Sequence, residues 1–587
     1  MRVLGYRTVD ALVDWLGDAS RPPLRRATPA ELAERLGGLE PAGFEAALAT
    51  LFEDVLPFTS HGSHPGFFAY VPFAGTWPGA LGDFVASATN VYAGSWQESA
   101  GPTQLELELL GWFKDWIGYP AEAAGSLVTG GSAANLTAIA CAREAVVGSM
   151  RDDLVIYASD QTHSSIARAA RVLGFRPEQL RVLPVDDDLR LEPAVLRAAL
   201  AADERAGRRP FLVIANAGAT SSGAVDPIGE LAALCAERSL WLHVDAAYGG
   251  FAVLTERGRA QLGELARADS ITLDPHKWLY QPYECGCLLV RDGRALRHGF
   301  EITSDYLRDA EVEDGLVNFS DYGLQLSRTS RAFKLWLSLG TFGVDAFRAA
   351  IDRTLDLAQL ARERIDASDV LELVAPPSLG IVCFRHREQH TDGLVAALEE
   401  SGLGLISSTR VHGRSALRLC ILSHTTTADD VERVLAFLET AEPLAAGPEY
   451  DPHVAVRASV SLFARLEPAE QAALAELAVE RTATAGEHLI ERWDQTRDFY
   501  VLDEGAVDIV VDGEIVKTLR TGDYFGEIGA LEWGAGFARS RVASVVARDD
   551  VRVRVLGPRA LAELLERFPR LEREIRHTAH ERMRETR

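Results

Sequence analysis

The sequence predicts an α/β protein with a large and a small domain, followed by a separate β-roll. From residue 61 to about 345, short apolar runs such as 155–157 and 211–214 alternate with Ala- and Leu-rich helical stretches. This alternation is typical of a mostly parallel sheet covered by helices on both faces. Residues 346–440 repeat the pattern on a smaller scale. Short strands with glycine turns follow in residues 456–587, which favours a small β-roll or barrel.

Length and composition exclude several classes of protein. At 587 residues the chain is too long for one ordinary core, and its 47% hydrophobic and 25% charged residues are typical of globular proteins. The formal net charge of −25 argues against nucleic acid or an anionic membrane as a partner. No basic-then-apolar leader and no apolar run of membrane-spanning length occurs, so we expect a cytoplasmic protein. Six cysteines without a paired pattern suit reduced thiols, and Cys285-Gly286-Cys287 predicts strand packing, with no metal site.

The first sixty residues predict three short helices. Apolar residues recur at helical spacing between Val9 and Leu16, and Pro22-Pro23 ends that segment. Further helices are expected from Pro29 and across residues 44–51. Three short amphipathic helices cannot bury their apolar faces alone. Either a second subunit or the chain's own large domain must cover them.

A strand, a glycine turn and a helix start follow one another in Leu-Val-Thr-Gly-Gly-Ser-Ala-Ala-Asn, residues 127–135. Such an arrangement points backbone N–H groups and the positive end of a helix at an anion. The turn, which contains Gly131 and Ser132, lacks the Gly-Lys-Ser/Thr ending of a nucleotide P-loop and the dinucleotide fingerprint. A Gly-Gly-Ser turn alone is a weak signal, so its meaning depends on the motifs that follow it.

Asp245 ends a second apolar strand and is followed by the small residues Ala246 and Ala247. A carboxylate beside a pyridine nitrogen keeps that nitrogen protonated and makes the ring an electron sink. The small residues would let a flat ring lie close to the backbone, whereas a helix cap is the alternative role for Asp245. His163, in a Ser- and Thr-containing stretch at 159–165, could stack on such a ring or cap a helix, and both roles can hold together.

Lys277 follows a third apolar strand at 270–273, which ends in Asp274-Pro275 and predicts a loop. A lysine after a strand is usually a solvated charge. Among aromatic and apolar neighbours, however, desolvation disfavours the ammonium ion and favours the free amine that attacks a carbonyl cofactor. Taken in chain order with the glycine turn and Asp245, this lysine predicts a site for pyridoxal 5'-phosphate.

Five stretches together resemble the group II pyridoxal-phosphate decarboxylases, which have the aspartate-aminotransferase-like fold (fold type I). They are HPGFFAYVP at 64–72, TGGSAANLTA at 129–138, SDQTHSSIARA at 159–169, LHVDAAYGG at 242–250 and DPHKW at 274–278. The similarity extends from the N-terminus to about residue 440. It implies an L-amino acid substrate, release of carbon dioxide and an amine, a homodimer clasped by residues 1–60, and pyridoxal phosphate bound covalently to Lys277. It assigns the cofactor to Gly131, Ser132, His163, Thr220, Asp245, Ala247, His276 and Lys277.

The resemblance also suggests residues on the substrate side. Tyr70, Phe73 and Trp77 match a stretch that lines the family's substrate pocket, although aromatic residues in a loop are as often core. Phe73 stands where aromatic-amino-acid members often carry a small hydroxyl residue, which leaves the preferred amino acid open. Tyr306 matches the mobile-loop tyrosine that protonates the substrate carbon, and aldehyde-forming members tend to lack it; an exposed loop tyrosine is the alternative. The implied catalytic residues are Lys277, Tyr306, His163 and Asp245.

A linker at 441–455 leads to a domain at 456–587 with its own motif. Gly-Asp-Tyr-Phe-Gly-Glu-Ile-Gly-Ala-Leu at 522–531, with the later Arg541, closely resembles the phosphate-binding cassette of cyclic-nucleotide-binding domains. Glu527 can accept a hydrogen bond from a ribose hydroxyl, and Arg541 can fork onto the cyclic phosphate. We expect the nucleotide to contact Gly526, Glu527, Ile528, Arg541 and Val542. Cyclic AMP is favoured over cyclic GMP because Val542 offers no hydroxyl, and a domain that has lost its ligand is the alternative.

The last thirty residues predict helix but leave too little chain for a helix-turn-helix, so a regulatory module is expected rather than a DNA-binding one. Three functions compete. The first is a decarboxylase controlled by a cyclic nucleotide. The second is a pyridoxal enzyme of another type, such as a carbon–sulfur lyase or an oxidative aldehyde-forming enzyme. The third is a nucleotide sensor whose enzyme half is inert.

Overall fold

The computed structural model describes residues 1–18, 20–36, 43–301, 316–441, 466, 468–492, 496–511, 514–531, 541 and 543–568, with parts of 570–579. Tyr306, Val542 and most of the predicted linker therefore lie outside the described residues. Among the helices within these ranges, none is long and apolar enough to cross a membrane.

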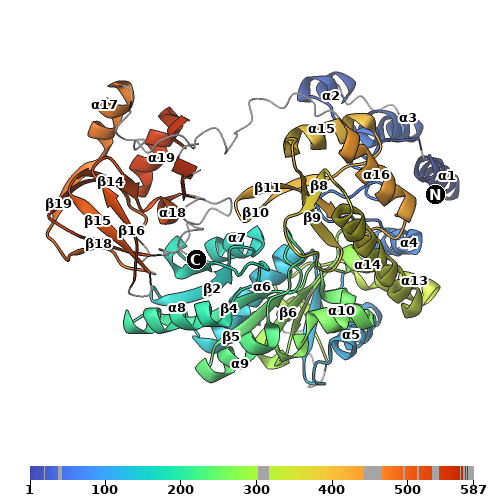
Figure 1. Ribbon diagram of the computed structural model, residues 1–587. Coiled ribbons are helices and arrows are strands. Elements are labelled where there is room, and N and C mark those ends of the chain that lie inside the picture. The colour runs from blue at the N-terminus through green and yellow to red at the C-terminus, as the bar shows by residue number, and fades with distance from the viewer. Residues whose placement is uncertain are drawn as a thin grey trace.

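A seven-stranded sheet forms the large domain (Figure 1). Its strands are β1 (Ala124–Val128), β2 (Leu154–Ser159), β3 (Leu180–Leu183), β4 (Arg209–Asn216), β5 (Trp241–Asp245), β6 (Ser270–Leu273) and β7 (Gly286–Val290). They lie in the order β1-β7-β6-β5-β4-β2-β3, and of these strands β7 alone runs in the direction opposite to the other six. The prediction of a mostly parallel sheet is confirmed. The carboxyl ends of β1, β5 and β6 consequently meet at one edge.

Helices cover both faces of this sheet, and the side chains of each strand alternate between two cores. Val155 and Tyr157 of β2 belong to one core, whereas Leu154 and Ile156 belong to the other. The first core is shared with α5 (Trp96–Ile117), α8 (Pro193–Arg205), α9 (Ile228–Arg238) and α10 (Glu256–Leu262), and the second with α6 (Gly131–Val146), α7 (Ser164–Val172) and α12 (Gly293–His298). Both faces of the strands are thus buried, which explains their continuous apolar runs.

A four-stranded antiparallel sheet in the order β10-β11-β9-β8 forms the small domain. Its elements are β8 (Leu371–Leu373), β9 (Ile381–His386), β10 (Ser407–Val411) and β11 (Arg414–Cys420), with α14 (Val344–Asp366), α15 (Thr391–Ser401) and α16 (Ala428–Thr440). Phe68 packs into its core beside Phe384 and Leu419, and the Phe68 N–H donates to the Leu405 carbonyl at 2.7 Å. The 64–72 stretch is therefore anchored on the small domain.

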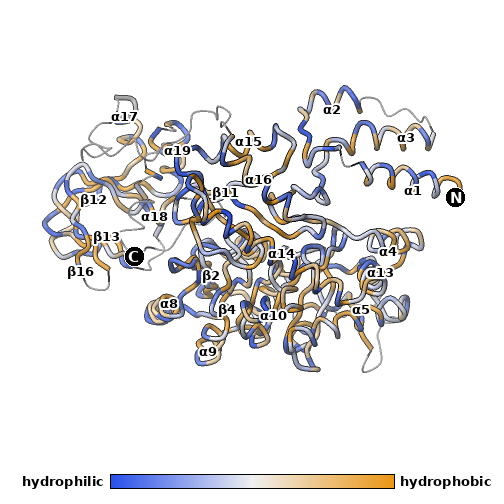
Figure 2. Tube along the Cα trace, turned by 45° about the vertical axis from the view of Figure 1, so that its right-hand side comes forward, coloured by the Kyte–Doolittle hydropathy of each residue, from blue (hydrophilic) through white to orange (hydrophobic). Residues whose placement is uncertain are grey.

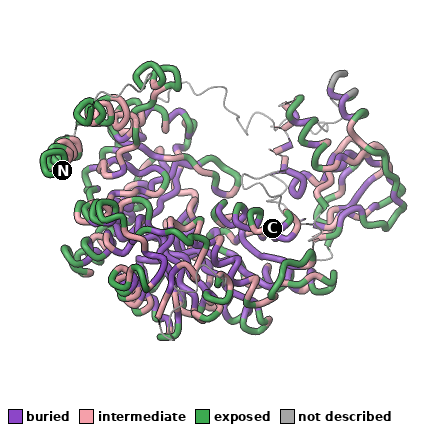
Figure 3. The backbone as a smooth tube through the Cα atoms, turned by 180° about the vertical axis from the view of Figure 1, so that it is seen from behind, coloured by how far each residue is buried: buried purple, intermediate pink, exposed green. Residues whose placement is uncertain are grey.

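The N-terminal helices leave their apolar side chains exposed. Within the described residues, α1 (Arg2–Gly17), α2 (Pro29–Leu36) and α3 (Phe44–Thr50) contain no buried residue. Two further helices, α4 (Trp77–Ala88) and α13 (Ala332–Phe342), pack against each other and add exposed Phe84 and Trp336. Figure 2 shows hydrophobic stretches along α1, and Figure 3 shows the same helix as exposed. The chain's own large domain therefore does not cover these faces.

Two four-stranded sheets, β12-β19-β14-β17 and β13-β18-β15-β16, build the C-terminal domain, as expected for a β-roll. The strands are β12 (Val479–Ala483), β13 (His488–Ile490), β14 (Phe499–Glu504), β15 (Ala506–Val511), β16 (Glu514–Arg520), β17 (Tyr524–Phe525), β18 (Ser544–Ala547) and β19 (Val551–Leu556), with α17 (Pro468–Leu477), α18 (Glu527–Ala530) and α19 (Pro558–Arg567). β15 and β16 pair antiparallel, with Val511 opposite Glu514.

Candidate functional site

One cavity of about 300 Å³ lies at the sheet edge where β1, β5 and β6 end. It is lined by every residue that the sequence assigns to the cofactor, namely Gly131, Ser132, His163, Thr220, Asp245, Ala247, His276 and Lys277. Its lining also includes Asn135, Ser165, Asn216, Tyr248, Asp274 and Glu284. Side chains from motifs far apart in the sequence therefore meet in one place.

The glycine turn brings three backbone segments close together. A Cβ added at Gly286 of β7 would lie 2.4 Å from Gly130 Cα, and one added at Gly131 would lie 2.9 Å from Asp274 Oδ2. A larger residue would not fit at Gly286 without moving the turn. Because α6 begins at Gly131, its start supplies N–H groups and the positive end of the helix dipole to the cavity lining. The turn can therefore hold an anionic group.

Lys277 lies on a one-turn helix, α11 (Pro275–Trp278), and not in the loop predicted from the sequence, because Pro275 is already set for the first helical position. Its Nζ lies 2.9 Å from Asp274 Oδ2. Burial lowers the pKa of Lys277, but the charge of Asp274 and the hydrogen bond to it outweigh burial and hold the pKa above its usual value. The expectation that desolvation favours the free amine is wrong here, because the neighbouring carboxylate supplies a counter-charge.

Asp274 also contacts a second member of the site. Its Oδ2 lies 3.5 Å from His276 Nε2, while His276 Nδ1 accepts a hydrogen bond from the Cys285 N–H at 3.2 Å. Burial lowers the pKa of His276 to about 4, so the imidazole is neutral and carries its hydrogen on the nitrogen that faces Asp274. Asp274 Oδ1 is buried and has no hydrogen-bond partner among the described residues.

Asp245 and His163 both use part of their polar surface for local structure. Asp245 Oδ2 accepts a hydrogen bond from Asn135 Nδ2 at 2.8 Å, and its Oδ1 accepts one from the Ala247 N–H at 3.1 Å. His163 caps α7, because its Nδ1 accepts a hydrogen bond from the Ser165 N–H at 3.2 Å. Burial lowers the pKa of His163, although the charge of Asp245 opposes this effect. The capping roles and the place in the cavity lining thus coexist.

Tyr70, Phe73 and Trp77 are not among the residues that line this cavity. Tyr70 is 66% exposed, and Trp77 begins α4 at the protein surface. The ring of Phe73 lies 5.0 Å from that of Tyr283, which in turn lies 4.7 Å from the His276 ring. Phe73 therefore reaches the site only through another ring. The roles of these three residues stay predictions, as does that of Tyr306, which lies outside the described residues.

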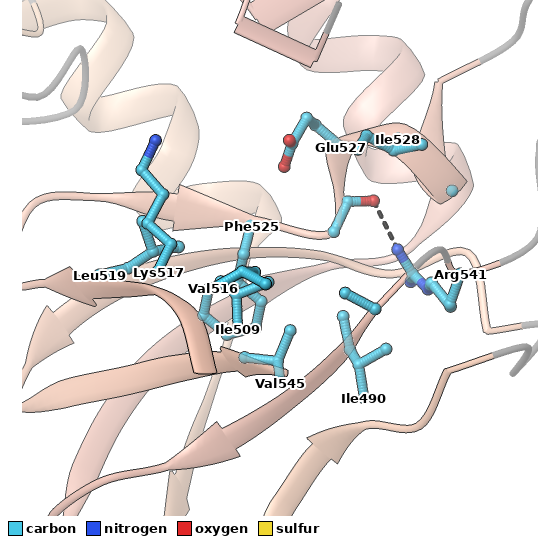
Figure 4. A pocket seen from close by; sticks show the side chains of 13 residues that line it. Ile490, Ile509, Val516, Lys517, Leu519, Phe525, Glu527, Ile528, Arg541 and Val545 are labelled. Atoms are coloured by element: carbon cyan, nitrogen blue, oxygen red, sulfur yellow. Dashed lines mark hydrogen bonds between the residues drawn. The ribbon is translucent and has the colours of Figure 1, made fainter. Parts of the chain in front are cut away.

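A second pocket lies in the C-terminal domain (Figure 4). Apolar side chains of Ile490, Ile509, Val516, Leu519, Phe525 and Val545 line it together with Lys517, Gly526, Glu527, Ile528, Gly529, Arg541 and Ala543. Arg541 donates hydrogen bonds to the carbonyl oxygens of Gly526 and Asp498. Gly526 has a φ of +87°, which favours glycine. The sequence-predicted residues therefore meet around one pocket, except for Val542, which lies outside the described residues.

Comparison with known proteins identifies both halves of the chain. The sequence pattern of the pyridoxal-dependent decarboxylase conserved domain matches residues 41–387. The chain belongs to the pyridoxal-dependent decarboxylase family. The pattern of the cyclic nucleotide-binding domain matches residues 480–568. A pyridoxal-phosphate-dependent carboxy-lyase is thus joined to a cyclic nucleotide-binding domain in one chain.

Relatives of this decarboxylase cover nearly all of its enzyme half. An aromatic-L-amino-acid decarboxylase of Bacillus atrophaeus is 38% identical over 453 residues, which span 74% of this chain and 94% of the relative. The solved structure of Oryza sativa TDC with PLP and tryptamine superposes with a TM-score of 0.71 at 31% identity, covering 75% of this chain and 96% of that one. A phenylacetaldehyde synthase of Petunia hybrida is 32% identical over 398 residues, which span 65% of this chain and 79% of the relative. The predicted fold type I architecture is confirmed.

The cavity of the decarboxylase fits pyridoxal phosphate by the chemistry of its groups. The helix start at Gly131 offers N–H groups to a phosphate, Lys277 offers an amine to an aldehyde, and Asp245 offers a carboxylate to a ring nitrogen. When bound, the cofactor supplies an electron sink for the carbanion left after loss of carbon dioxide.

Two polar residues of the site, Asn135 and Asp274, lie inside the motifs noted above but receive no role from the sequence alone. Asn135 is buried on a helix face shared with Ala134, Ala138 and Ile139. A single amide among apolar neighbours needs hydrogen-bond partners, and that is the signal that points to it. Asp274 lies three residues before Lys277, a spacing at which opposite charges meet in a helical turn.

Proposed function

We propose that this decarboxylase acts on an aromatic L-amino acid and releases carbon dioxide and the corresponding amine, with pyridoxal phosphate attached to Lys277. The proposal rests on one observation above all: Lys277, Asp245 and the glycine turn line the same cavity. The similarity to an aromatic-L-amino-acid decarboxylase and to TDC with PLP and tryptamine supports the aromatic substrate.

Each residue receives a task from its position. The N–H groups at Gly131 and Ser132 would bind the phosphate, and His163, which lines the same cavity, would stack on the ring. Asp245 pairs with the ring nitrogen and keeps it protonated. Tyr306 or Lys277 would donate the proton that replaces carbon dioxide on the substrate carbon, and the amine of Lys277 would take back its bond to the cofactor as the product amine leaves.

The substrate is tested by incubating the purified protein with L-tryptophan, L-tyrosine, L-phenylalanine and L-glutamate in separate reactions. Carbon dioxide, amine and hydrogen peroxide are measured for each. We expect carbon dioxide and amine in equal amounts from at least one aromatic amino acid and no peroxide. Aldehyde with peroxide would instead support an oxidative aldehyde-forming enzyme, and cofactor binding without turnover would support an inert enzyme half.

We also propose that the protein is a homodimer in the cytoplasm. The exposed apolar side chains of α1, α4 and α13 support an interface with a second copy. All six cysteines are buried and free, which suits a reducing compartment. Sedimentation equilibrium should give twice the chain mass of 63.8 kDa. A mass equal to one chain at micromolar concentration would contradict the dimer.

We propose further that the C-terminal domain binds a cyclic nucleotide, cyclic AMP in preference to cyclic GMP, and that binding changes the rate of decarboxylation. The apolar walls of the pocket suit a base, and Glu527 and Arg541 suit a ribose and a phosphate. Isothermal titration of the full chain with each nucleotide measures binding. Equal decarboxylation rates with and without saturating amounts of either nucleotide would contradict the coupling.

A further inference from the structure

A continuous chain of buried hydrogen bonds leads from Trp241 to Asp245. Trp241 Nε1 lies 2.8 Å from Ser270 Oγ, which lies 2.8 Å from His243 Nδ1. His243 Nε2 then lies 3.0 Å from Asn135 Oδ1, and Asn135 Nδ2 lies 2.8 Å from Asp245 Oδ2. All five residues are buried, and hydrogen bonds are electrostatically stronger in such surroundings than in water.

The chemistry of the two ends fixes the direction of every bond in this chain. A carboxylate only accepts, so the amide nitrogen of Asn135 faces Asp245 and its oxygen faces His243. The Trp241 N–H only donates, so Ser270 Oγ accepts from it. Burial lowers the pKa of His243 to about 4, so the ring is neutral. Asn135 Oδ1 only accepts, so the single hydrogen of this ring is on Nε2 and is donated to Asn135, while Nδ1 accepts from the Ser270 hydroxyl.

Asn135 is the branch point, and all four of its hydrogen-bonding positions are used. Besides the bonds to Asp245 and His243, its Nδ2 donates to Ser165 Oγ at 2.9 Å and its Oδ1 accepts from the Thr272 hydroxyl at 2.7 Å. A rotated amide would place its oxygen against the carboxylate and its NH2 group against the His243 N–H. The surroundings therefore permit one amide orientation, which presents a donor to Asp245.

The same residue also connects Asp245 with the imidazole of the cavity. Ser165 Oγ, which accepts from Asn135, lies 2.9 Å from His163 Nδ1 and can donate its own hydrogen there. Both that hydroxyl and the Ser165 N–H then donate to Nδ1, so His163 carries its hydrogen on Nε2. One asparagine thus links the two groups expected at the cofactor ring.

We propose that Asn135 is a positioning residue that aims the Asp245 carboxylate at the cofactor's ring nitrogen, and that Trp241, Ser270 and His243 fix the orientation of its amide. The inference rests on the proposed function, since it takes Asp245 as the partner of that nitrogen. Without Asn135, the Asp245 oxygen that it contacts loses a hydrogen-bond donor, and the carboxylate is free to turn away from the ring nitrogen. The ring nitrogen is then protonated in a smaller fraction of the molecules.

The test uses the full-length holoenzyme loaded with pyridoxal phosphate labelled with 15N in the ring. Asn135→Ala and Asn135→Asp are compared with the wild type and with Thr137→Ala, a buried position on the same helix whose hydroxyl donates to the Ala133 carbonyl. We expect a protonated ring nitrogen in the wild type and in Thr137→Ala. Both Asn135 variants should shift the 15N signal toward the unprotonated form. An unshifted signal in Asn135→Ala with bound cofactor overturns the proposal.

Kinetics give a second readout on the same variants. Loss of one hydrogen bond to a charged group predicts a kcat about ten- to hundredfold lower in Asn135→Ala, with KM within about twofold of the wild type. A change in KM alone would point to altered substrate binding and would contradict a role at the ring nitrogen.

A measurement on the unmutated protein keeps the proposal testable if the variants fail to fold. The 15N spectrum of the histidine side chains, with residue 243 assigned through His243→Gln, must show the Nε2–H tautomer at neutral pH. The Nδ1–H tautomer or a doubly protonated ring overturns the proposal. A wild type that takes up no pyridoxal phosphate would refute the proposed function as well. A wild type that binds the cofactor and turns over substrate, together with an unshifted ring signal in Asn135→Ala, would contradict only this inference.

Discussion

The amine of Lys277 lies 2.9 Å from the carboxylate of Asp274, and this pairing holds the pKa of the lysine above its usual value in spite of burial. A lysine must lose its proton before it can attack an aldehyde. In the cofactor-free protein, Asp274 therefore keeps Lys277 in the form that cannot react. The same carboxylate lies beside the glycine turn that is expected to receive the phosphate.

Asp274→Asn should speed the uptake of pyridoxal phosphate by the cofactor-free protein. Removing the counter-charge leaves burial as the main influence, so the pKa of Lys277 falls and more of the amine is free at neutral pH. The pH profile of the uptake rate, followed by absorbance, should move to lower pH. Asp269→Asn is the control, because that half-buried carboxylate accepts a hydrogen bond from the Leu242 N–H and does not line the cavity. A profile that stays in place or moves to higher pH would refute this account of the ion pair.

Asp245→Asn should retain the cofactor but decarboxylate slowly. An amide cannot supply the negative charge that keeps the ring nitrogen protonated, and loss of such a charged hydrogen bond corresponds to a kcat about ten- to hundredfold lower. The rate of carbon dioxide release by the cofactor-loaded variant, compared with that of the wild type, is the measurement. If kcat stayed within about twofold of the wild type, Asp245 would not be the partner of the ring nitrogen.

Arg541→Lys should weaken cyclic AMP binding about ten- to hundredfold, because the lysine ammonium cannot donate the two parallel hydrogen bonds that a guanidinium gives to a phosphate. Arg541 also ties the carbonyls of Gly526 and Asp498 together, which lysine reproduces less well. Arg548→Lys is the control, because Arg548 pairs with Asp508 in the same domain and does not line the pocket. Calorimetry that finds equal affinity in both variants would argue against the phosphate role of Arg541.

Phe84→Asp should convert the proposed dimer into monomers. Phe84 is 63% exposed on α4, and a charge placed in a covered apolar interface is costly. Val172→Asp changes a residue that is 67% exposed at the end of α7 and serves as the control. Light scattering after gel filtration measures both masses. A dimeric Phe84→Asp protein would show that the interface lies elsewhere.

The strands and the cavity could be predicted from the sequence because they depend on local patterns. Strands buried on both faces read as apolar runs, and motifs at the ends of parallel strands must meet at one edge of the sheet. The protonation state of Lys277 could not be predicted from local patterns, because it depends on the balance between burial and one neighbouring charge. The role of Asn135 escaped prediction because its partners, including Asp245 and Thr272, are distant in the sequence.

The exposure of the aromatic residues could not be predicted from the sequence either. Tyr70 and Trp77 are partly exposed in the single chain, and whether they line a substrate pocket depends on what covers that surface. Phe73, by contrast, contacts Tyr283, whose ring contacts His276 of the site. No sequence motif indicates this contact.

The central claim is tested most directly by finding which lysine holds the cofactor. The sequence contains only four lysines, Lys114, Lys277, Lys334 and Lys517, so reduction of the holoenzyme with borohydride and peptide mass analysis gives an unambiguous answer. We predict the label on the peptide that contains Lys277, and loss of both label and carbon dioxide release in Lys277→Ala. A label on any other lysine, or near-normal amine release by Lys277→Ala, would contradict the account.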